Sequence, residues 1–480
     1  MTPLQIRLGD HVTLAVPPHL DSITTYVLLE QETWFEKELN FVSQWLKPGM
    51  TAIDVGANLG VYTLPMARMV GPQGRVFAYE PGSEARNLLE QSRKINGASN
   101  LAIFPFALSD GEREGRLAWG SSSELNALGH AGKGETVHIT SLDIENEKRG
   151  WDSPDFIKID AEGEEERILA GGGLFFARHS PLVMFEIKAG AVTNELRAAF
   201  AAMGYQLFRL LVGAPILVSL DPQAPLDPFE LNLFAAKPDR VRSLCDEGFL
   251  VDQISAWEPD SVALSGGLSL LREQPFASAF GRLLDDTGQI DSDYAKVLAA
   301  YAVWRTNDLP AQRRFAALLF AYQSLAALCK RAPTTARYST FARLAWEGGW
   351  RSECVKTLRQ MAALIQWNPF QPTEPCWPPN PRFDKIVAAD DPALWFATSV
   401  AEQLERAQSH STYFSGVSPW LASLCEQPAV SHEMHRRKVL LQVLRGENPI
   451  VPSCLRQAAP GHLNADVWRK GMVPGTKRGE

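Results

Sequence analysis

The residues best placed to do chemistry begin with a glycine-rich turn, D-V-G-A-N-L-G, at positions 54–60. The turn follows a short β-type run and opens a helix-type run, which is where open α/β sheets bind nucleotide-like ligands. Gly56 and Gly60 let the backbone pass close to such a ligand, and the Asp54 carboxylate can accept hydrogen bonds or balance a nearby positive charge. The turn therefore predicts a ligand site.

Two further features indicate which chemical class of ligand the turn binds. A dinucleotide fingerprint would carry glycine where this chain has Asn58 and Val61, so the spacing disfavours NAD. Glu80 ends the next β-type run, directly before Pro81, and its carboxylate could accept hydrogen bonds from both hydroxyls of a ribose. A glycine turn alone could merely tighten a strand against a helix, and a strand-end acid alone could merely be solvated. Together they favour an adenosyl ligand.

A second group of charged residues lies in F-I-K-I-D-A-E-G, at 156–163. The period-2 alternation of a strand puts Lys158, Asp160 and Glu162 on one side. Charges inside a central strand are costly, so Lys158 and Asp160 either pair with each other or lie at the open end of the strand, in the ligand cleft.

Glu186, inside V-M-F-E-I, repeats the pattern near the end of the next predicted strand. It would either point into the same cleft or pair with Lys158 or Lys188. His130 and His138 fall in or beside a predicted inserted loop, where each is either a general base that titrates near neutral pH or a solvated side chain.

The elements that must position these residues alternate between β-type and helix-type runs from 51 to about 237, which predicts an α/β fold with a parallel sheet covered by helices. The predicted strands are 51–55, 75–80, 101–108, 156–160, 182–187, 205–211 and 231–236, and the predicted helices are near 60–70, 83–96, 164–177 and 191–203. Only a Pro-rich loop separates the last two strands, so we expect them to pair antiparallel.

The segments around this unit suggest three domains, at 1–50, 51–240 and 241–480. The first 50 residues read as short strands followed by an amphipathic helix at 33–46, which would lid the sheet. Residues 121–136 are rich in Ser and Gly and predict an inserted loop near the carboxyl ends of the strands, where loops usually select substrates.

Beyond residue 240 helical periodicity replaces the β pattern, and an all-α domain is expected. Trp304 and Trp346 lie in similar helix-turn-helix settings that resemble degenerate tetratricopeptide-like units. Six prolines between 368 and 382 predict a long loop. This region could recognise a carrier or protein partner, or form a homodimer.

Composition excludes several classes of function. The first 240 residues hold 21 Lys and Arg against 31 Asp and Glu, and no cluster of basic residues appears, which disfavours nucleic-acid binding. No apolar run reaches the length of a membrane span.

The six cysteines form no C-x-x-C pair, and no early hydrophobic signal segment is present, so we expect a reduced, cytoplasmic protein. His432 and His435 have no third ligand in view, so no metal site is predicted.

These residues, in this order, resemble the FkbM-type family of S-adenosylmethionine-dependent methyltransferases. The match covers roughly 39–238 and rests on K-P-G at 47–49, D-V-G-A-N-L-G-V-Y-T at 54–63, Y-E-P at 79–81, A-L-S-D at 107–110, S-L-D at 141–143 and I-K-I-D-A-E-G-x-E at 157–165. The family usually has D-V-E-G where this chain has D-A-E-G, so Ala161 is a mild departure. The helical half has no counterpart in the minimal family domain.

The resemblance implies a class I methyltransferase (Rossmann-like) fold of seven strands with the last antiparallel, and O-methylation of a hydroxyl on a sugar, glycan or polyketide-type acceptor. It also implies roles for residues. Asp54, Gly56, Asn58 and Gly60 would hold the amino acid part of S-adenosylmethionine, Glu80 its ribose, and Ser109 and Asp110 would lie near its adenine. Asp160 and Glu162 would flank the reacting methyl group.

Methyl transfer to a hydroxyl depends mostly on alignment and gains further from a group that accepts the hydroxyl proton. Asp160, Glu162, Glu186 and His130 are the candidates for the group that accepts this proton, and we favour Asp160.

Two other interpretations of the function stay open. The chain could be a scaffold with a donor-binding but inactive fold, although Asp54 and Glu80 are intact. It could also be an N- or C-methyltransferase, although the sheet domain lacks an N-P-P-Y type motif.

Overall fold

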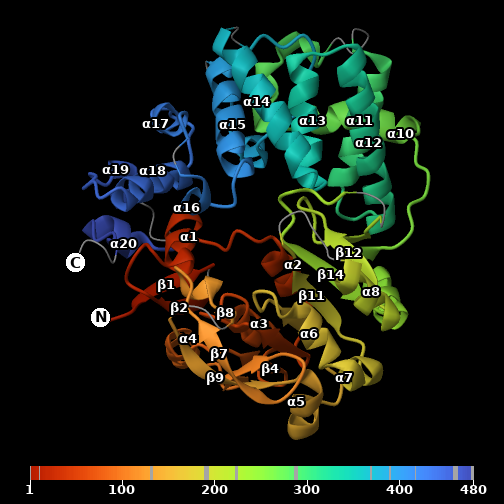
Figure 1. The fold of residues 1–480 in the computed structure, drawn as a ribbon. Coiled ribbons are helices and arrows are strands. Elements are labelled where there is room, and N and C mark those ends of the chain that lie inside the picture. The colour runs from red at the N-terminus through yellow and green to blue at the C-terminus, as the bar shows by residue number, and fades with distance from the viewer. Residues whose placement is uncertain are drawn as a thin grey trace.

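A computed structural model describes residues 2–9, 11–129, 133–188, 194–221, 225–285, 290–367, 370–388, 391–416, 418–457 and 463–476. Figure 1 shows an α/β part that carries both termini and a helical part stacked on one end of it. The expectation of an α/β fold followed by a large helical region is confirmed.

The central sheet lies in the α/β part. Its strands follow the spatial order β15 (Leu250–Val251), β13 (Leu217–Ser219), β12 (Gln206–Leu210), β14 (Asn232–Ala236), β11 (Leu182–Glu186), β10 (Phe156–Ile159), β3 (Thr51–Val55), β4 (Arg75–Tyr79) and β5 (Leu101–Phe104). The strands from β11 to β5 are parallel, and β14 runs antiparallel to both of its neighbours. The predicted antiparallel pairing of the last two strands is therefore confirmed.

The sequence predicted seven strands, whereas the central sheet has nine strands in the described residues. The apolar run that begins in β12 turns back after residue 211 to form β13, which pairs antiparallel with β12. β15 comes from the region expected to be all-α and pairs parallel with β13. These two short strands extend the edge of the sheet toward the helical region.

The strand predicted at 101–108 is interrupted at Pro105, because proline has no N–H to donate to the ladder. Its second half, β6 (Phe106–Leu108), leaves the central sheet and joins a smaller one with β9 (Gly134–Thr140), β7 (Arg113–Ala118) and β8 (Ala127–Leu128). In the segment expected as a loop at 121–136, residues 127–128 and 134–136 therefore belong to this sheet, and Ser123–Leu125 form a short 3-10 turn.

Helices cover both faces of the central sheet, and the strand alternation explains why. One face packs against α2 (Glu38–Trp45), α3 (Thr63–Val70), α4 (Ser83–Ile95) and α9 (Pro238–Asp246). The other packs against α5 (Leu142–Arg149), α6 (Glu165–Ala170), α7 (Gly173–Arg178) and α8 (Asn194–Ala202). In β3, Ala52 faces the first layer while Ile53 and Val55 face the second. The predicted lid helix at 33–46 begins only at Glu38.

The helical part consists mainly of α10 (Ser261–Arg272), α11 (Ser292–Arg305), α12 (Ala311–Arg331), α13 (Thr335–Glu347), α14 (Arg351–Trp367) and α15 (Pro392–Ala407). Successive helices in this series contact one another. Three 3-10 turns, Pro275–Ala279, Gly281–Leu283 and Pro381–Lys385, join them. Residues 370–380 form no helix or strand, as the prolines predicted. None of the described helices combines the length and apolar character that crossing a membrane requires.

The end of the chain returns to its beginning (Figure 1). The N-terminal hairpin of β1 (Leu4–Leu8) and β2 (Val12–Val16) and the helix α1 (Ile23–Gln31) share one core with α18 (His432–Leu444), α19 (Ser453–Arg456) and α20 (Ala465–Lys470). Two short helices, α16 (Thr412–Ser415) and α17 (Leu421–Leu424), lead into them. Nothing in the sequence predicted this long-range contact.

Candidate active site

A cavity of about 320 Å³ opens at the carboxyl ends of β3, β4, β10 and β11. Most of the predicted site residues line it, namely Asp54, Gly56, Asn58, Glu80, Asp160, Glu162 and Glu186. Parallel strands bring their carboxyl ends to one edge of a sheet, which is why residues up to 132 positions apart converge. The inserted segment supplies another wall through Ser123 to Asn126 and Leu128.

The glycine-rich turn has the backbone geometry that its composition implied. Gly56 has a φ of +77°, and a Cβ at that position would lie 1.8 Å from the carbonyl oxygen of Asp160. Asn58 also has a positive φ, of 45°, which asparagine tolerates better than most residues. Gly60, with a φ of +88°, packs against the side chains of Leu64 and Leu89. Gly60 thus shapes the turn and joins it to the helix layer.

Asp54 is fully buried at the end of β3. One of its oxygens accepts a hydrogen bond of 2.5 Å from the Thr63 hydroxyl, whereas the other, Oδ1, has no hydrogen-bond partner among the described residues. Burial raises the pKa of this carboxyl, and the positive charge of Lys158 opposes that shift. A buried acceptor without a partner is costly, so Oδ1 is suited to receive a donor from a bound ligand.

Glu80 closes the other side of the turn. Its Oε2 accepts the backbone N–H of Asn58 at 2.8 Å, and its Oε1 accepts that of Gly82 at 2.7 Å. Burial raises its pKa to about 7, while these two backbone donors act in the opposite direction. Each oxygen keeps a second lone pair, so the held carboxylate can still accept hydrogen bonds from a pair of adjacent hydroxyls.

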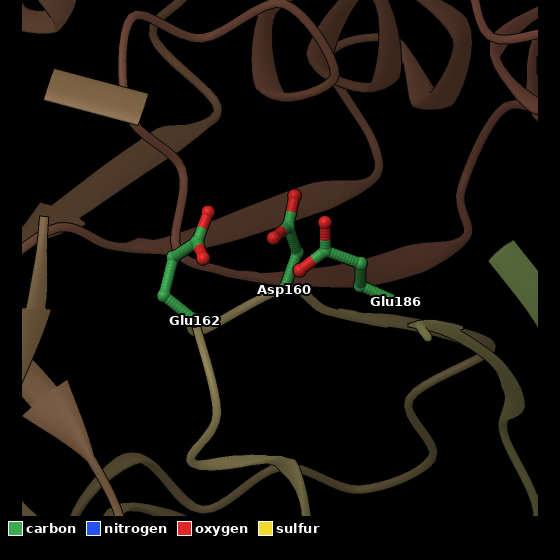
Figure 2. A group of neighbouring side chains, drawn as sticks. All are labelled: Asp160, Glu162 and Glu186. Atoms are coloured by element: carbon green, nitrogen blue, oxygen red, sulfur yellow. The ribbon is translucent and has the colours of Figure 1, made fainter. Parts of the chain in front are cut away.

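Three carboxylate groups line the cavity close to one another. Asp160, Glu162 and Glu186 each offer an oxygen, and these oxygens lie within 4.8 Å of one another. Figure 2 shows the three carboxyl groups on the same side of the chain, with Asp160 between the two glutamates. Such a group could share a proton, or could ligate a hard divalent cation.

The proximity of the acids raises the pKa of two of them, Glu162 and Glu186. Burial, the charge of Asp160 and that of Glu165 raise the pKa of Glu162 to about 7. Burial and the charges of Asp160 and Glu162 raise the pKa of Glu186 well above its usual range. Glu162 also has a φ of 50°, which is uncommon outside glycine and asparagine and often marks a functional position.

Lys158 places a positive charge beside Asp160, one of the three carboxylates. Its Nζ lies 2.6 Å from Asp160 Oδ2, and the side chain is almost entirely buried. Burial alone would lower the pKa of Lys158, but the carboxylates of Asp160, Asp54 and Glu36 raise it. Both alternatives from the sequence hold at once, because Lys158 and Asp160 form an ion pair and Asp160 also faces the cavity.

Sequence reasoning missed the residues that connect this ion pair to the opposite wall. The Tyr62 hydroxyl donates a 2.6 Å hydrogen bond to Glu36, and the Lys158 ammonium lies 5.1 Å from the centre of the Tyr62 ring. Tyr62 falls in the V-Y-T part of the turn motif, which was a signal for its involvement. Glu36 precedes α2, and nothing local marked it as part of the site.

Four of the sequence candidates, Gly60, Ser109, Asp110 and His138, are not part of the cavity lining. Ser109 Oγ donates to Glu164 at 2.5 Å, and Asp110 forms an exposed ion pair with Arg113 that lowers its pKa. Neither residue lines the cavity, whereas the three residues just before them, 106–108, do. His130 lies outside the described residues. His138 contacts Glu112 and Glu114 near the surface and is not part of the cavity lining.

A family model and a curated relative match parts of this chain. A family model described as the methyltransferase FkbM domain matches residues 54–207. A protein-L-isoaspartate O-methyltransferase of Triticum aestivum is 32% identical over 95 residues, which are 20% of this chain and 40% of that protein. The chain thus spans less than half of the length of this curated relative.

Solved structures show partial likeness. A SAM-dependent O-methyltransferase of Thermotoga maritima has 17% identity and a TM-score of 0.27, covering 49% of this chain and 78% of its own. A precorrin-6y C5,15-methyltransferase of Geobacter metallireducens has 14% identity and a TM-score of 0.25, covering 42% and 86%. Residues 54–207 thus match the methyltransferase FkbM domain, and S-adenosylmethionine is the cofactor that this match implies.

Proposed function

We propose that the protein transfers a methyl group from S-adenosylmethionine to a hydroxyl of a sugar, glycan or polyketide-type acceptor. The observation that carries this proposal is that Asp160, Glu162 and Glu186 converge in the same cavity as the donor-binding turn. A hydroxyl is a weak nucleophile, and a carboxylate beside it can accept its proton as the new bond forms.

The residues present fit the donor. The partnerless Oδ1 of Asp54 is a buried acceptor, and the donor's ammonium group could supply the missing hydrogen bond. Glu80, held by two backbone N–H groups, can accept from the two ribose hydroxyls. Asn58 and the glycines shape the turn around the amino acid part. Ser109 and Asp110 do not line the cavity, so apolar residues 106–108 are better placed beside an adenine.

The donor supplies a methyl group bonded to a positively charged sulfur. The work of the protein is to align the acceptor oxygen with that carbon and to take away the proton. The oxygen gains a bond to carbon, the carbon–sulfur electron pair stays on sulfur, and the proton moves to the carboxylate cluster. Asp160 remains our preferred acceptor of that proton, with Glu162 able to change its charge near neutral pH and Lys158 holding Asp160 in place.

The decisive experiment is calorimetric titration of the full chain with S-adenosylmethionine and with S-adenosylhomocysteine. We expect micromolar binding that is lost in Asp54→Ala and Glu80→Ala. Asp110→Ala is the matched control, since that carboxylate is exposed and lies outside the cavity lining. No binding by the intact protein would contradict the proposal and favour the scaffold interpretation.

We extend this proposal to the domain division, the cellular setting and the role of the helical region. We propose a division into 1–50, 51–240 and 241–480, a reduced cytoplasmic setting, and either a protein partner or a homodimer for the helical region. The setting is supported by six cysteines that are all free thiols. Cores that combine α1 with α18 and β13 with α11 indicate that these three parts act as one packed unit.

A further inference from the structure

A second cavity, of about 190 Å³, lies beside the donor cavity. Phe35, Glu36 and Leu231 line both cavities, so the two spaces meet at these three side chains. The other walls come from the loop before β14 and, in the helical part, from α13, α14, α15 and α18. This cavity is therefore the place where the helical region comes next to the catalytic site.

Three aromatic rings form part of the wall. Phe35, Phe229 and Trp346 reach the cavity from three separate parts of the chain. The Arg351 guanidinium lies 4.6 Å from the centre of the Phe229 ring and 5.6 Å from that of Trp346, so the rings and the cation form one continuous surface. Flat apolar surfaces of this kind stack against the faces of ring-shaped ligands.

Some of the charged groups in the cavity already form ion pairs or hydrogen bonds that stabilise the fold. Glu433 forms ion pairs with Arg406 at 2.6 Å and with Arg437 at 3.0 Å. Asp227 accepts hydrogen bonds from the backbone N–H and the hydroxyl of Ser352. These groups hold α14, α15 and α18 around the cavity.

Other polar groups retain capacity for a ligand. Arg351 donates to the carbonyls of Ala407 and Arg406 and to the ring nitrogen of His410, all of which are neutral. Burial raises the pKa of Glu38 to about 8 and that of Glu230 to about 7. The cavity thus offers carboxyl groups and a guanidinium donor beside three aromatic rings.

We propose that this second cavity is the acceptor pocket and that it takes a neutral hydroxylated ring, a sugar residue, which passes one hydroxyl between Phe35, Glu36 and Leu231 toward Asp160. The inference rests on the proposed methyl transfer and deepens it. Sugar hydroxyls both donate and accept hydrogen bonds, which matches the mixture of carboxyl and guanidinium groups, while the ring face stacks on the aromatic wall. An apolar polyketide surface would offer no hydrogen-bond partner to Glu38 or Glu230, which both line the cavity.

The test is saturation-transfer NMR on the full chain, loaded with S-adenosylhomocysteine, with a panel of methyl glucosides, galactosides, mannosides and rhamnosides as probes. Glu230→Gln and Trp346→Leu alter the pocket while leaving the donor cavity untouched. Glu353→Gln and Trp257→Leu are the matched controls, since both residues belong to the helical region and line neither cavity.

We expect at least one glycoside to bind the wild type and both controls, and to bind about tenfold more weakly to each pocket variant. The affinity for S-adenosylhomocysteine should be equal in all five proteins. Equal glycoside binding in the pocket variants, or no glycoside binding by a protein that binds S-adenosylhomocysteine, would overturn the acceptor assignment. So would Trp346-dependent binding of a sugar-free macrolactone in place of the glycosides. Absence of S-adenosylhomocysteine binding in the wild type would instead contradict the proposed function itself.

Discussion

Gly56 and the main chain of Asp160 are in direct contact: a Cβ on Gly56 would lie 1.8 Å from the Asp160 carbonyl oxygen. The two residues follow the neighbouring parallel strands β3 and β10, and the Asp160 N–H also bonds to the carbonyl of Val55 at 3.1 Å. The donor-binding turn and the carboxylate cluster are thus held against each other through their backbones. A change in one would displace the other.

Gly56→Ala should therefore damage both donor binding and stability. The added methyl group meets a backbone oxygen that cannot move aside, and alanine at a φ of +77° is itself strained. We expect affinity for S-adenosylhomocysteine to fall more than about tenfold, with a lower melting temperature. Gly173→Ala is the control, because nothing lies within 4 Å of its added Cβ. Unchanged binding in Gly56→Ala would disprove the close contact.

Asp160→Asn tests the role of that carboxylate in the reaction. Asparagine keeps the shape but cannot take the proton, so donor affinity should persist while turnover falls by about 10²- to 10⁴-fold. The readout is methyl transfer from labelled S-adenosylmethionine, with calorimetry on the same samples. Asp152→Asn, an exposed acid before β10, should retain full turnover. Wild-type turnover in Asp160→Asn would remove this residue from the mechanism.

The rate of methyl transfer should depend on pH through Glu162. Its pKa is raised to about 7 by burial and by its acidic neighbours, so the carboxyl is protonated below that pH and cannot take over the proton that Asp160 accepts. Turnover at saturating donor should therefore rise with pH up to about 7 and then level off. Glu162→Gln should flatten this rise. A rise that persists unchanged in the variant would assign the titration to another group.

Methyl transfer should not require a divalent metal, although three carboxylates lie close enough to bind one. The Lys158 ammonium, 2.6 Å from Asp160 Oδ2, already supplies a buried positive charge to the cluster. We therefore expect the same turnover with a chelator as with added Mg²⁺. Turnover lost in the chelator and restored by Mg²⁺ would show that the cluster is a metal site after all.

Glu38 should make the folded protein less stable as the pH rises. Burial, then the charges of Glu36 and Glu230, raise its pKa from 4.5 to about 8, so the folded chain binds more protons than the unfolded chain between these values. The free energy of unfolding must then decrease with increasing pH across that window. Glu38→Gln removes this group from the titration and should lose less stability between about pH 6 and about pH 8, by a few kcal/mol.

Chemical denaturation at both pH values measures this difference. Glu84→Gln, an exposed glutamate in the first turn of α4, should follow the wild type. A parallel loss of stability in wild type and Glu38→Gln would show that Glu38 ionises at its ordinary pKa.

Local patterns were sufficient to predict that several of the candidate residues line one cavity. Asp54, Gly56 and Asn58 adjoin one strand and Glu80 ends the next, and the alternation of parallel strands and helices brings their ends together without further information. The carboxylate cluster could be predicted for the same reason, because Asp160 and Glu186 follow neighbouring strands. The raised pKa values of Glu162 and Glu186 could not be predicted, because they depend on the distances between the acids.

Short-range reasoning failed where proline or chain reversal redirects a strand. Pro105 moves Phe106 out of the central sheet. Residues 106–108 still line the cavity, but the candidate pair Ser109 and Asp110 that follows them does not. The edge strands β13 and β15 form only because an apolar run folds back on itself and then meets a segment about 30 residues later. Such pairings depend on where the sheet has an open edge, which local propensity does not specify.

The sequence by itself determined the chemistry at the ends of the central strands, since turn geometry and strand alternation act over a few residues. Tertiary structure alone decided what surrounds that chemistry. Glu36 reaches Tyr62, and Trp346 and Arg351 meet Phe229 and Phe35, only after helices from distant parts of the chain pack on the sheet. Those contacts depend on the shapes of buried surfaces that come together only in the folded chain, so no local pattern in the sequence encodes them.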